Sequence, residues 1–282
     1  MNTTKVKCPA KINLTLEVLN KRDDGFHNIK SIMQTISLYD YLTIKVESAD
    51  KNLIELSGTS SDIPYNENNL VYKAIDLYLK EAKINNLKIN VFIEKNIPIS
   101  AGLAGGSTDG AGVIWGLNYL LEIFDNSKLN ELCAQLGSDL NVCLNGGTIL
   151  ATSRGEVIKK LPDVDSILTL IKPKKLGISA KEAYTKYSQR EIKLQNGMTE
   201  KMLIAILDND DIRQYLYNDL EFAVFDDYKE LQVIKSAYPK SIMSGSGSTY
   251  FILDNIEDFE LNNDYEIINN LKFISTGVDL AD

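Results

Sequence analysis

The amino-acid sequence predicts an α+β fold, and two patterns along the chain indicate it. Residues 42–47 and 88–94 alternate apolar with polar side chains, which is typical of a half-buried strand. Stretches that begin near residues 69, 113 and 127 instead place apolar side chains at helical spacing. Because strands and helices do not alternate strictly, we favour an α+β arrangement over a doubly wound parallel sheet.

The first expected strand lies close to the N-terminus. Ile12, Leu14 and Leu16 would form its buried face, and the same period of two puts Lys11 beside Asn13 on the other face. Taken alone, a lysine in such a strand usually lies on the solvent side. The next expected strands are 42–47 and 88–94.

Helix signals follow the strands. Asn68 or Asn69 suits the N-cap of a helix that begins at residue 70. A second helix follows the glycine-rich segment near residue 105, with an apolar stripe that we extend as far as Phe124. A third can begin at Ser127 and end at Gly137. Asp139 then lies in connecting backbone, where residues of functional sites are often presented.

Charge and composition exclude several classes of function. The formal net charge of -9 argues against nucleic acid as a partner, because such binding needs a basic stripe. There is no apolar run of eighteen residues and no signal-like start, so we expect a cytoplasmic protein without a membrane partner. Three widely spaced cysteines and one histidine support neither a disulfide framework nor a metal site of protein ligands.

Residues 98–109 form a glycine-rich segment between an expected strand and an expected helix. Small residues there let an anion approach the backbone, and the free N–H groups at a helix N-terminus favour a phosphate. A merely tight turn is the simpler alternative, but a turn needs only one or two glycines. The P-loop pattern fails because Gly106 stands where its Lys belongs, and the dinucleotide pattern fails at Gly102-Leu103-Ala104.

With Pro98 leading it, this loop resembles the phosphate loop of the GHMP kinase superfamily. Two more segments strengthen the resemblance: Pro9-Ala10-Lys11-Ile12-Asn13-Leu14 at the N-terminus and Ser244-Gly245-Ser246-Gly247-Ser248-Thr249 near the C-terminus. Together with Gly25-Phe26-His27, they are similar to the members whose alcohol substrate is 4-diphosphocytidyl-2-C-methyl-D-erythritol, of the non-mevalonate isoprenoid pathway. The resemblance implies ATP-dependent phosphorylation of the C2 hydroxyl of that substrate.

The resemblance also implies two domains. The N-terminal one would resemble ribosomal protein S5 domain 2 and the C-terminal one would be ferredoxin-like, with the site in the cleft between them. We place the boundary near Leu161-Pro162, which gives residues 1–160 with the ATP loop and catalytic residues, and residues 161–282.

By resemblance, Asp139 is the catalytic base and Lys11 keeps it ionised and orients the hydroxyl. An ionised carboxylate within hydrogen-bond reach can take the hydroxyl proton as the bond to phosphorus forms. By itself, an Asp after a helix-ending Gly is more often a turn residue.

The alcohol substrate would meet four further residues. Asn13 is expected to bind the erythritol end. Phe26 and His27 would meet the cytosine, by stacking and by hydrogen bonds to its edge, and Tyr184 matches the aromatic residue on the opposite face. Without the family, His27 reads as a surface loop residue and the aromatic rings as packing.

For ATP, the resemblance assigns the adenine end to Asn69 and Lys95. The phosphates are assigned to the loop residues Pro98, Ser100, Ala101, Gly102, Leu103, Ala104, Gly105, Gly106, Ser107 and Thr108. Mg²⁺ is implied as the companion of ATP, usually with few protein ligands. Ala104 stands where the family has Gly, at a cost on the order of 1 kcal/mol if φ is positive there.

Two alternatives remain open at this point. One is a GHMP kinase for another small alcohol such as homoserine, which would have no use for Phe26 and His27. The other is a non-catalytic nucleotide-binding regulator of the same fold, which would not need Lys11 and Asp139.

Overall fold

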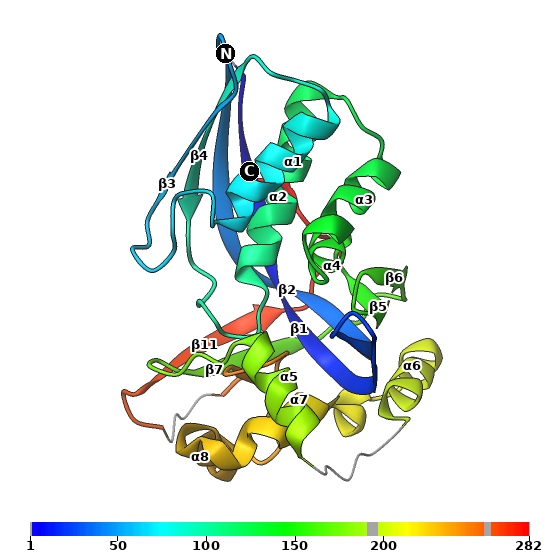
Figure 1. Ribbon diagram of the computed structural model, residues 1–282. Helices are drawn as coiled ribbons and strands as arrows, with labels where there is room; N and C mark the ends of the chain where they lie inside the picture. Colours follow the sequence, from blue (N-terminus) through cyan, green and yellow to red (C-terminus); the bar gives the residue numbers. More distant parts are fainter. Residues whose placement is uncertain (1, 191–196, 257–260, 282) are drawn as a thin grey trace.

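The computed structural model describes residues 2–190, 197–256 and 261–281. It contains an eight-stranded sheet and a four-stranded sheet, with helices packed on each (Figure 1). The prediction of an α+β fold is therefore confirmed.

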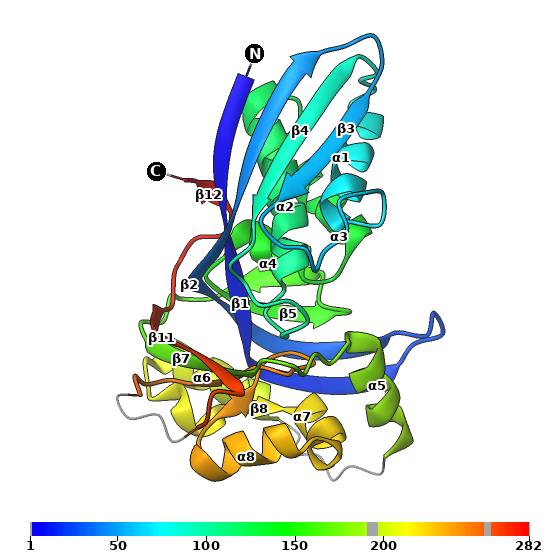
Figure 2. The ribbon, with the colours of Figure 1, turned by 90° about the vertical axis from the view of Figure 1, so that its left-hand side faces the viewer.

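The larger sheet is built around one long antiparallel hairpin. Its main path runs β12-β1-β2-β4-β3, while β5 pairs with β2, β6 pairs with β5 and β8 pairs with β1. The strands are β1 (Asn2–Lys21), β2 (His27–Ser48), β3 (Leu53–Gly58), β4 (Leu87–Glu94), β5 (Thr148–Ser153), β6 (Val157–Lys160), β8 (Tyr217–Asn218) and β12 (Asp279–Leu280). Figure 2 shows that β1 and β2 extend from the upper sheet into the lower half, where their connecting turn lies near α5.

Helices cover one face of the upper part of this sheet (Figures 1 and 2). They are α1 (Leu70–Glu81), α2 (Gly105–Leu121), α3 (Asn126–Leu136) and the short α4 (Leu140–Asn145). The core between them and the sheet joins Val6 and Ile44 of the strands to Ile75 of α1 and Ile114 of α2. Burial of these apolar side chains fixes α2, and with it the loop that leads into it.

The smaller sheet has the strand order β11-β7-β10-β9, with every pair antiparallel. Numbered in chain order, this is 4-1-3-2, the order of a ferredoxin-like sheet. Its strands are β7 (Ile167–Pro173), β9 (Ile242–Met243), β10 (Tyr250–Ile252) and β11 (Tyr265–Lys272). The accompanying helices are α5 (Ala180–Gln189), α6 (Met198–Asp208), η1 (Ile212–Tyr215), α7 (Asp219–Val224), η2 (Phe225–Asp227) and α8 (Lys229–Ala237).

The expected local signals agree with the structure except at two helix ends. One of them is the start of α3, which begins at Asn126 with Asp125 as its N-cap, one residue before the expected Ser127. Asn69 is the N-cap of α1 and accepts a hydrogen bond from the Val71 amide, and Gly137 ends α3. The prediction that α2 continues to Phe124 is wrong, because this helix ends at Leu121 and Glu122 has a left-handed backbone conformation. Phe124 instead packs edge-on against Tyr78, with ring centroids 5.1 Å apart.

The domain boundary at residues 160 and 161 stays a prediction. Two short strands beyond it add to the larger sheet: β8 pairs with β1 at Thr15 and Leu16, and β12 pairs with β1 at Val6 and Lys7. These two pairings bring β1 against the C-terminal half of the chain.

Candidate active site

A cavity of about 990 Å³ lies where β1, the glycine-rich loop and α5 meet. Residues from the N-terminal strands line it together with residues of α5 and of the turn between β9 and β10. Those predicted for the site that line the cavity are Lys11, Asn13, Phe26, His27, Gly102, Ala104, Ser107, Asp139 and Tyr184. The structure therefore brings the predicted catalytic pair and the predicted base-binding residues to one cavity.

Lys11 is buried, which differs from the solvent-facing position usual for a lysine in a strand. Only 3% of its surface is exposed, and Asn13 on the same face of β1 is 1% exposed. The Lys11 ammonium donates to Asn13 Oδ1 at 2.8 Å and to the Gly102 carbonyl at 3.1 Å. Asn13 Nδ2 in turn donates to Ser31 Oγ at 2.9 Å. The position of Lys11 is thus fixed from both sides.

Asp139 lies at the N-terminus of α4, directly across from Lys11. Its Oδ2 is 3.5 Å from Lys11 Nζ, and 31% of its side chain is exposed. The carboxylate makes no capping bond to its own helix, so it can accept a proton from a group in the cavity. An ammonium beside a partly exposed carboxylate is the arrangement expected for a general base and its partner.

The glycine-rich loop connects β4 to α2 and meets both halves of the chain. Ala104, the last residue of the loop before α2, has φ +60. The alanine that stands here in place of the family's glycine therefore adopts the left-handed conformation that a Cβ disfavours. Gly102 has φ +74, and a Cβ there would lie 2.0 Å from the Ser244 carbonyl oxygen. Ser244 Oγ donates to the Gly102 carbonyl at 3.0 Å. Glycine is required at position 102 because the two loops meet backbone to backbone.

The turn between β9 and β10 reaches Lys11, the predicted catalytic lysine. A Cβ on Gly245 would lie 3.3 Å from Lys11 Nζ. Asn218 Nδ2 donates to the carbonyls of Met243 and Gly245 at 2.7 and 2.8 Å, which fastens this turn to β8 and so to β1. The second glycine-serine motif therefore completes the site from the C-terminal half.

Other residues predicted for ATP occupy positions outside the cavity lining. Ala101, Leu103 and Thr108 are buried with at most 2% of their surface exposed, so they can offer only backbone groups to a ligand. Asn69 uses its side chain locally: Oδ1 caps α1 and Nδ2 donates to the Pro64 carbonyl at 2.7 Å. The remaining loop positions outside the lining are Pro98, Ser100, Gly105 and Gly106.

Lys95 departs most from the expected contact with adenine. Its side chain is 5% exposed, and its ammonium pairs with Asp40 of β2 and, at 2.9 Å, with Asp109 of α2. Asp40 and Asp109 were not predicted from the sequence, although Asp109 directly follows the predicted phosphate loop. No local pattern could have found this cluster, because its members come from three separate elements.

Aromatic residues line the cavity near the turn that joins β1 to β2. The rings of His27 and Tyr184 stack on each other, with centroids 5.3 Å apart and planes 15° apart, and Tyr187 meets His27 edge-on. Phe26 is 54% exposed and lies beneath the Arg154 guanidinium, 5.4 Å from its ring centroid. In this structure a flat base can stack on the exposed Phe26, whereas His27 and Tyr184 contact each other directly.

His27 is poised to form hydrogen bonds as a neutral ring. Burial, with a smaller contribution from Lys21, lowers the pKa of His27 below its ordinary value. At neutral pH the imidazole then carries one N–H donor and one acceptor. Nε2 lies 3.2 Å from Ser188 Oγ of α5.

The cavity lining is rich in cations that the sequence analysis did not single out. Lys21, Arg154 and Lys181 line it in addition to Lys11, and Asp139 is the one carboxylate among the lining residues that the structure describes. Arg154 is oriented by Glu156, which accepts from its backbone amide at 2.8 Å and pairs with its Nε at 3.5 Å. Such a lining suits an anionic ligand, despite the net negative charge of the chain.

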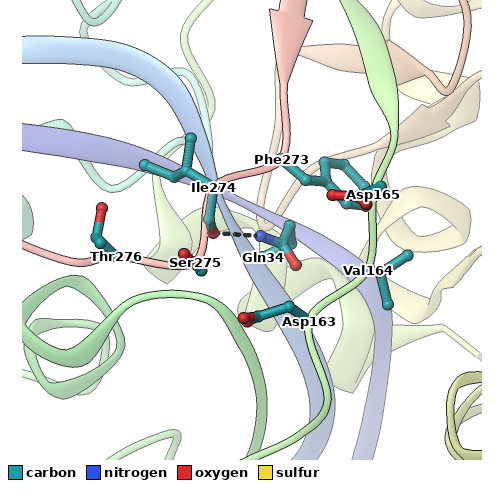
Figure 3. Close-up of a pocket in the computed structure, with 8 residues that line it drawn as sticks. All are labelled: Gln34, Asp163, Val164, Asp165, Phe273, Ile274, Ser275 and Thr276. Atoms are coloured by element: carbon teal, nitrogen blue, oxygen red, sulfur yellow. Dashed lines mark hydrogen bonds between the residues drawn. The ribbon is translucent and has the colours of Figure 1, made fainter.

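A second hollow, of about 370 Å³, lies away from these residues. Gln34, residues 163–165 and residues 273–276 line it, and Gln34 Nε2 donates to the Ile274 carbonyl at 2.9 Å (Figure 3). It contains none of the predicted site residues. Within the described part of the chain, no group of three or more His, Cys, Asp or Glu side chains could hold a metal ion, and all three cysteines are buried and free.

Comparison with known proteins agrees with this geometry. Residues 69–149 match the GHMP kinases N terminal domain. A 4-diphosphocytidyl-2-C-methyl-D-erythritol kinase of Clostridioides difficile (strain 630) is 40% identical over 92% of this chain and 89% of its own length. One from Acaryochloris marina (strain MBIC 11017) is 34% identical over 99% of both chains. The chain belongs to the 4-diphosphocytidyl-2-C-methyl-D-erythritol kinase family of GHMP kinases.

Solved structures support the same assignment. A crystal structure of 4-(cytidine 5'-diphospho)-2C-methyl-D-erythritol kinase superposes with a TM-score of 0.71 at 30% identity, covering 88% of this chain and 89% of that one. A homoserine kinase from Cytophaga hutchinsonii superposes at 0.73 with 17% identity over 100% and 98%, which shows the shared fold. The protein is accordingly an ATP-dependent small-molecule kinase. In the described residues, no helix is both long and apolar enough to cross a membrane.

Proposed function

We propose that this chain phosphorylates the C2 hydroxyl of 4-diphosphocytidyl-2-C-methyl-D-erythritol with ATP, in the non-mevalonate isoprenoid pathway. The observation that carries the proposal is the single cavity in which Lys11 and Asp139 lie beside the phosphate loop, with Phe26, His27 and Tyr184 in the lining of the same cavity. The four cations of the lining suit the diphosphate that joins the cytidine to the alcohol.

The proposed reaction needs alignment and charge compensation more than covalent chemistry. Asp139 accepts the proton of the substrate hydroxyl as the hydroxyl oxygen bonds to the γ-phosphorus of ATP. The bond from that phosphorus to the leaving ADP oxygen breaks. Lys11, held by Asn13 and Gly102, stabilises the charge that develops between the carboxylate and the transferred group. The amides of the loop hold the phosphates of ATP.

Mg²⁺ is part of the proposal as the partner of ATP. The described residues contain no carboxylate cage for it, which fits an ion held mainly by phosphates and water, with Ser107 lining the cavity nearby. When bound, Mg²⁺ would offset the negative charge of the phosphates. A cytoplasmic location also remains a prediction from the sequence.

The base end of the cavity gives a direct test of the proposed substrate. Replacing Phe26 by Ala should weaken binding of the cytidine substrate by about 1–3 kcal/mol, the usual contribution of stacking between an aromatic side chain and a base. His27→Ala should lower the preference for the cytidine over the uridine form, because hydrogen bonds read the base edge. The measurement is kcat/KM for both forms with the wild type and each variant.

The matched control for this test is Phe92→Ala. Phe92 lies on β4 and is 41% exposed, and it does not line the cavity. This variant should retain wild-type kinetics. A wild type that treats both forms alike, or a Phe26→Ala variant that loses affinity for ATP instead, would place the base elsewhere and contradict the proposed substrate.

A further inference from the structure

Beneath the phosphate loop lies a buried ion cluster that the proposed reaction does not use. It consists of Asp40, Lys95 and Asp109, whose side chains are at most 5% exposed. Two carboxylates share one ammonium here. Burial would lower the pKa of Lys95, but the carboxylates of Asp109 and Asp40 raise it above its usual value, so the ammonium remains charged.

The cluster holds the segment that enters the loop. Asp40 Oδ1 accepts from the amides of Asn96 and Ile97 at 2.6 and 2.8 Å, and its Oδ2 pairs with Lys95. Three consecutive residues are thereby bound to one carboxylate of β2. The loop begins at the next residue, Pro98.

The same ammonium holds the segment that leaves the loop. Lys95 Nζ donates to Asp109 Oδ2 at 2.9 Å, in the second turn of α2. A Cβ on Gly105, the first residue of α2, would lie 2.9 Å from Lys95 Nζ. The ammonium therefore packs against the underside of the loop, and its carboxylate partners keep it there.

We propose that Lys95, together with Asp40 and Asp109, is a positioning group that ties both ends of the phosphate loop together and so sets the affinity for ATP. Lys95 acts through the loop backbone and does not recognise the adenine. The inference rests on the proposed function in one respect, the assignment of this loop to the phosphates of ATP.

Steady-state kinetics of Lys95→Met with ATP and with GTP test the proposal. Without the Lys95 ammonium the two ends of the loop are no longer tied together and the loop is misplaced. KM for ATP should therefore rise on the order of 10- to 100-fold. KM for GTP should rise by the same factor, because the phosphates are common to both nucleotides. KM for the alcohol substrate should stay within about twofold, because the side chains proposed to bind that substrate lie outside the loop.

Asp109→Asn keeps the shape of the side chain and provides a milder variant in case Lys95→Met does not fold. It should raise KM for ATP in the same direction and, in the Lys95→Met background, add little, because groups that act as a unit are not additive. The control is Lys88→Met near the start of β4, whose ammonium pairs with Glu55 at 2.9 Å and takes no part in the cluster. It should leave both KM values unchanged.

Gly106→Val separates failure of this inference from failure of the proposed function. Apart from its chain neighbours and the backbone of α2, no described atom lies within 4 Å of a Cβ at Gly106, so this variant adds a side chain to the first turn of α2 without disturbing the cluster. If Gly106→Val weakens ATP binding while the cluster variants do not, the positioning role of the cluster is contradicted and the assignment of the loop to the ATP phosphates stands. If Lys95→Met changes the ratio of ATP to GTP usage, Lys95 contacts the base and the inference is also contradicted. Unchanged ATP affinity in all three variants would contradict the loop assignment itself.

Discussion

Asp139→Asn is expected to lower kcat by about two to four orders of magnitude, the range for loss of a general base. The amide cannot take the hydroxyl proton, and it no longer balances the charge of Lys11, 3.5 Å away. Because 31% of the Asp139 side chain is exposed and it makes no capping bond, the fold should be preserved. Binding of ATP and of the alcohol substrate, measured by calorimetry, should change little.

Lys11→Ala should also reduce turnover, and the double variant distinguishes a catalytic pair from two separate effects. If the two residues act as a unit, Lys11→Ala combined with Asp139→Asn should cost less than the sum of the single variants. Asp163→Asn, at the second hollow, is the control and should retain wild-type kcat. An Asp139→Asn variant with undiminished turnover would remove Asp139 from the mechanism.

The second large effect is expected from Gly102→Ala. The backbone term alone, a Cβ at φ +74, costs about 1–2 kcal/mol. The added Cβ would also lie 2.0 Å from the Ser244 carbonyl oxygen and 3.1 Å from the Gly247 amide. Since neither group is a flexible side chain, the two loops must separate. This removes the Gly102 carbonyl from Lys11, and turnover should fall by about 10²-fold.

Gly197→Ala isolates the backbone term of that prediction. Gly197 has φ +84, and no described atom lies within 4 Å of its Cβ position. Urea unfolding should show a loss of about 1–2 kcal/mol for this control and a larger loss for Gly102→Ala, with activity reduced only in the latter. Equal losses of stability with full activity in both variants would show that the contact of the two loops does not support the site.

Local features were predictable from the sequence because they depend on neighbouring residues. The cap at Asn69 and the end of α3 at Gly137 need only hydrogen bonds within a few residues. The helix before Phe124 was predicted too long, because Phe124 packs on Tyr78 of another helix and so resembles a continued stripe. Its apolar character reflects a tertiary contact that helical spacing does not reveal.

Long-range features could not be predicted in the same way. Lys11 is covered by the loop at Gly102 and by the turn at Gly245, which is more than 200 residues away in the sequence. The expected contact of Lys95 with adenine took no account of Asp40 and Asp109, which meet it only after β2, β4 and α2 have packed. Likewise the stack of His27 on Tyr184 joins residues from two halves of the chain.

The proposed function is tested most directly by one steady-state kinase assay with purified protein, ATP and three alcohols side by side: 4-diphosphocytidyl-2-C-methyl-D-erythritol, homoserine and mevalonate. Because the cavity joins the Lys11 and Asp139 pair to the rings of Phe26 and His27, we expect turnover of the cytidine diphosphate substrate. Homoserine and mevalonate should give kcat/KM values lower by at least about 10³-fold, since they leave the base and diphosphate contacts unmade. Preferential phosphorylation of homoserine or mevalonate, or turnover of none of the three, would contradict the proposal.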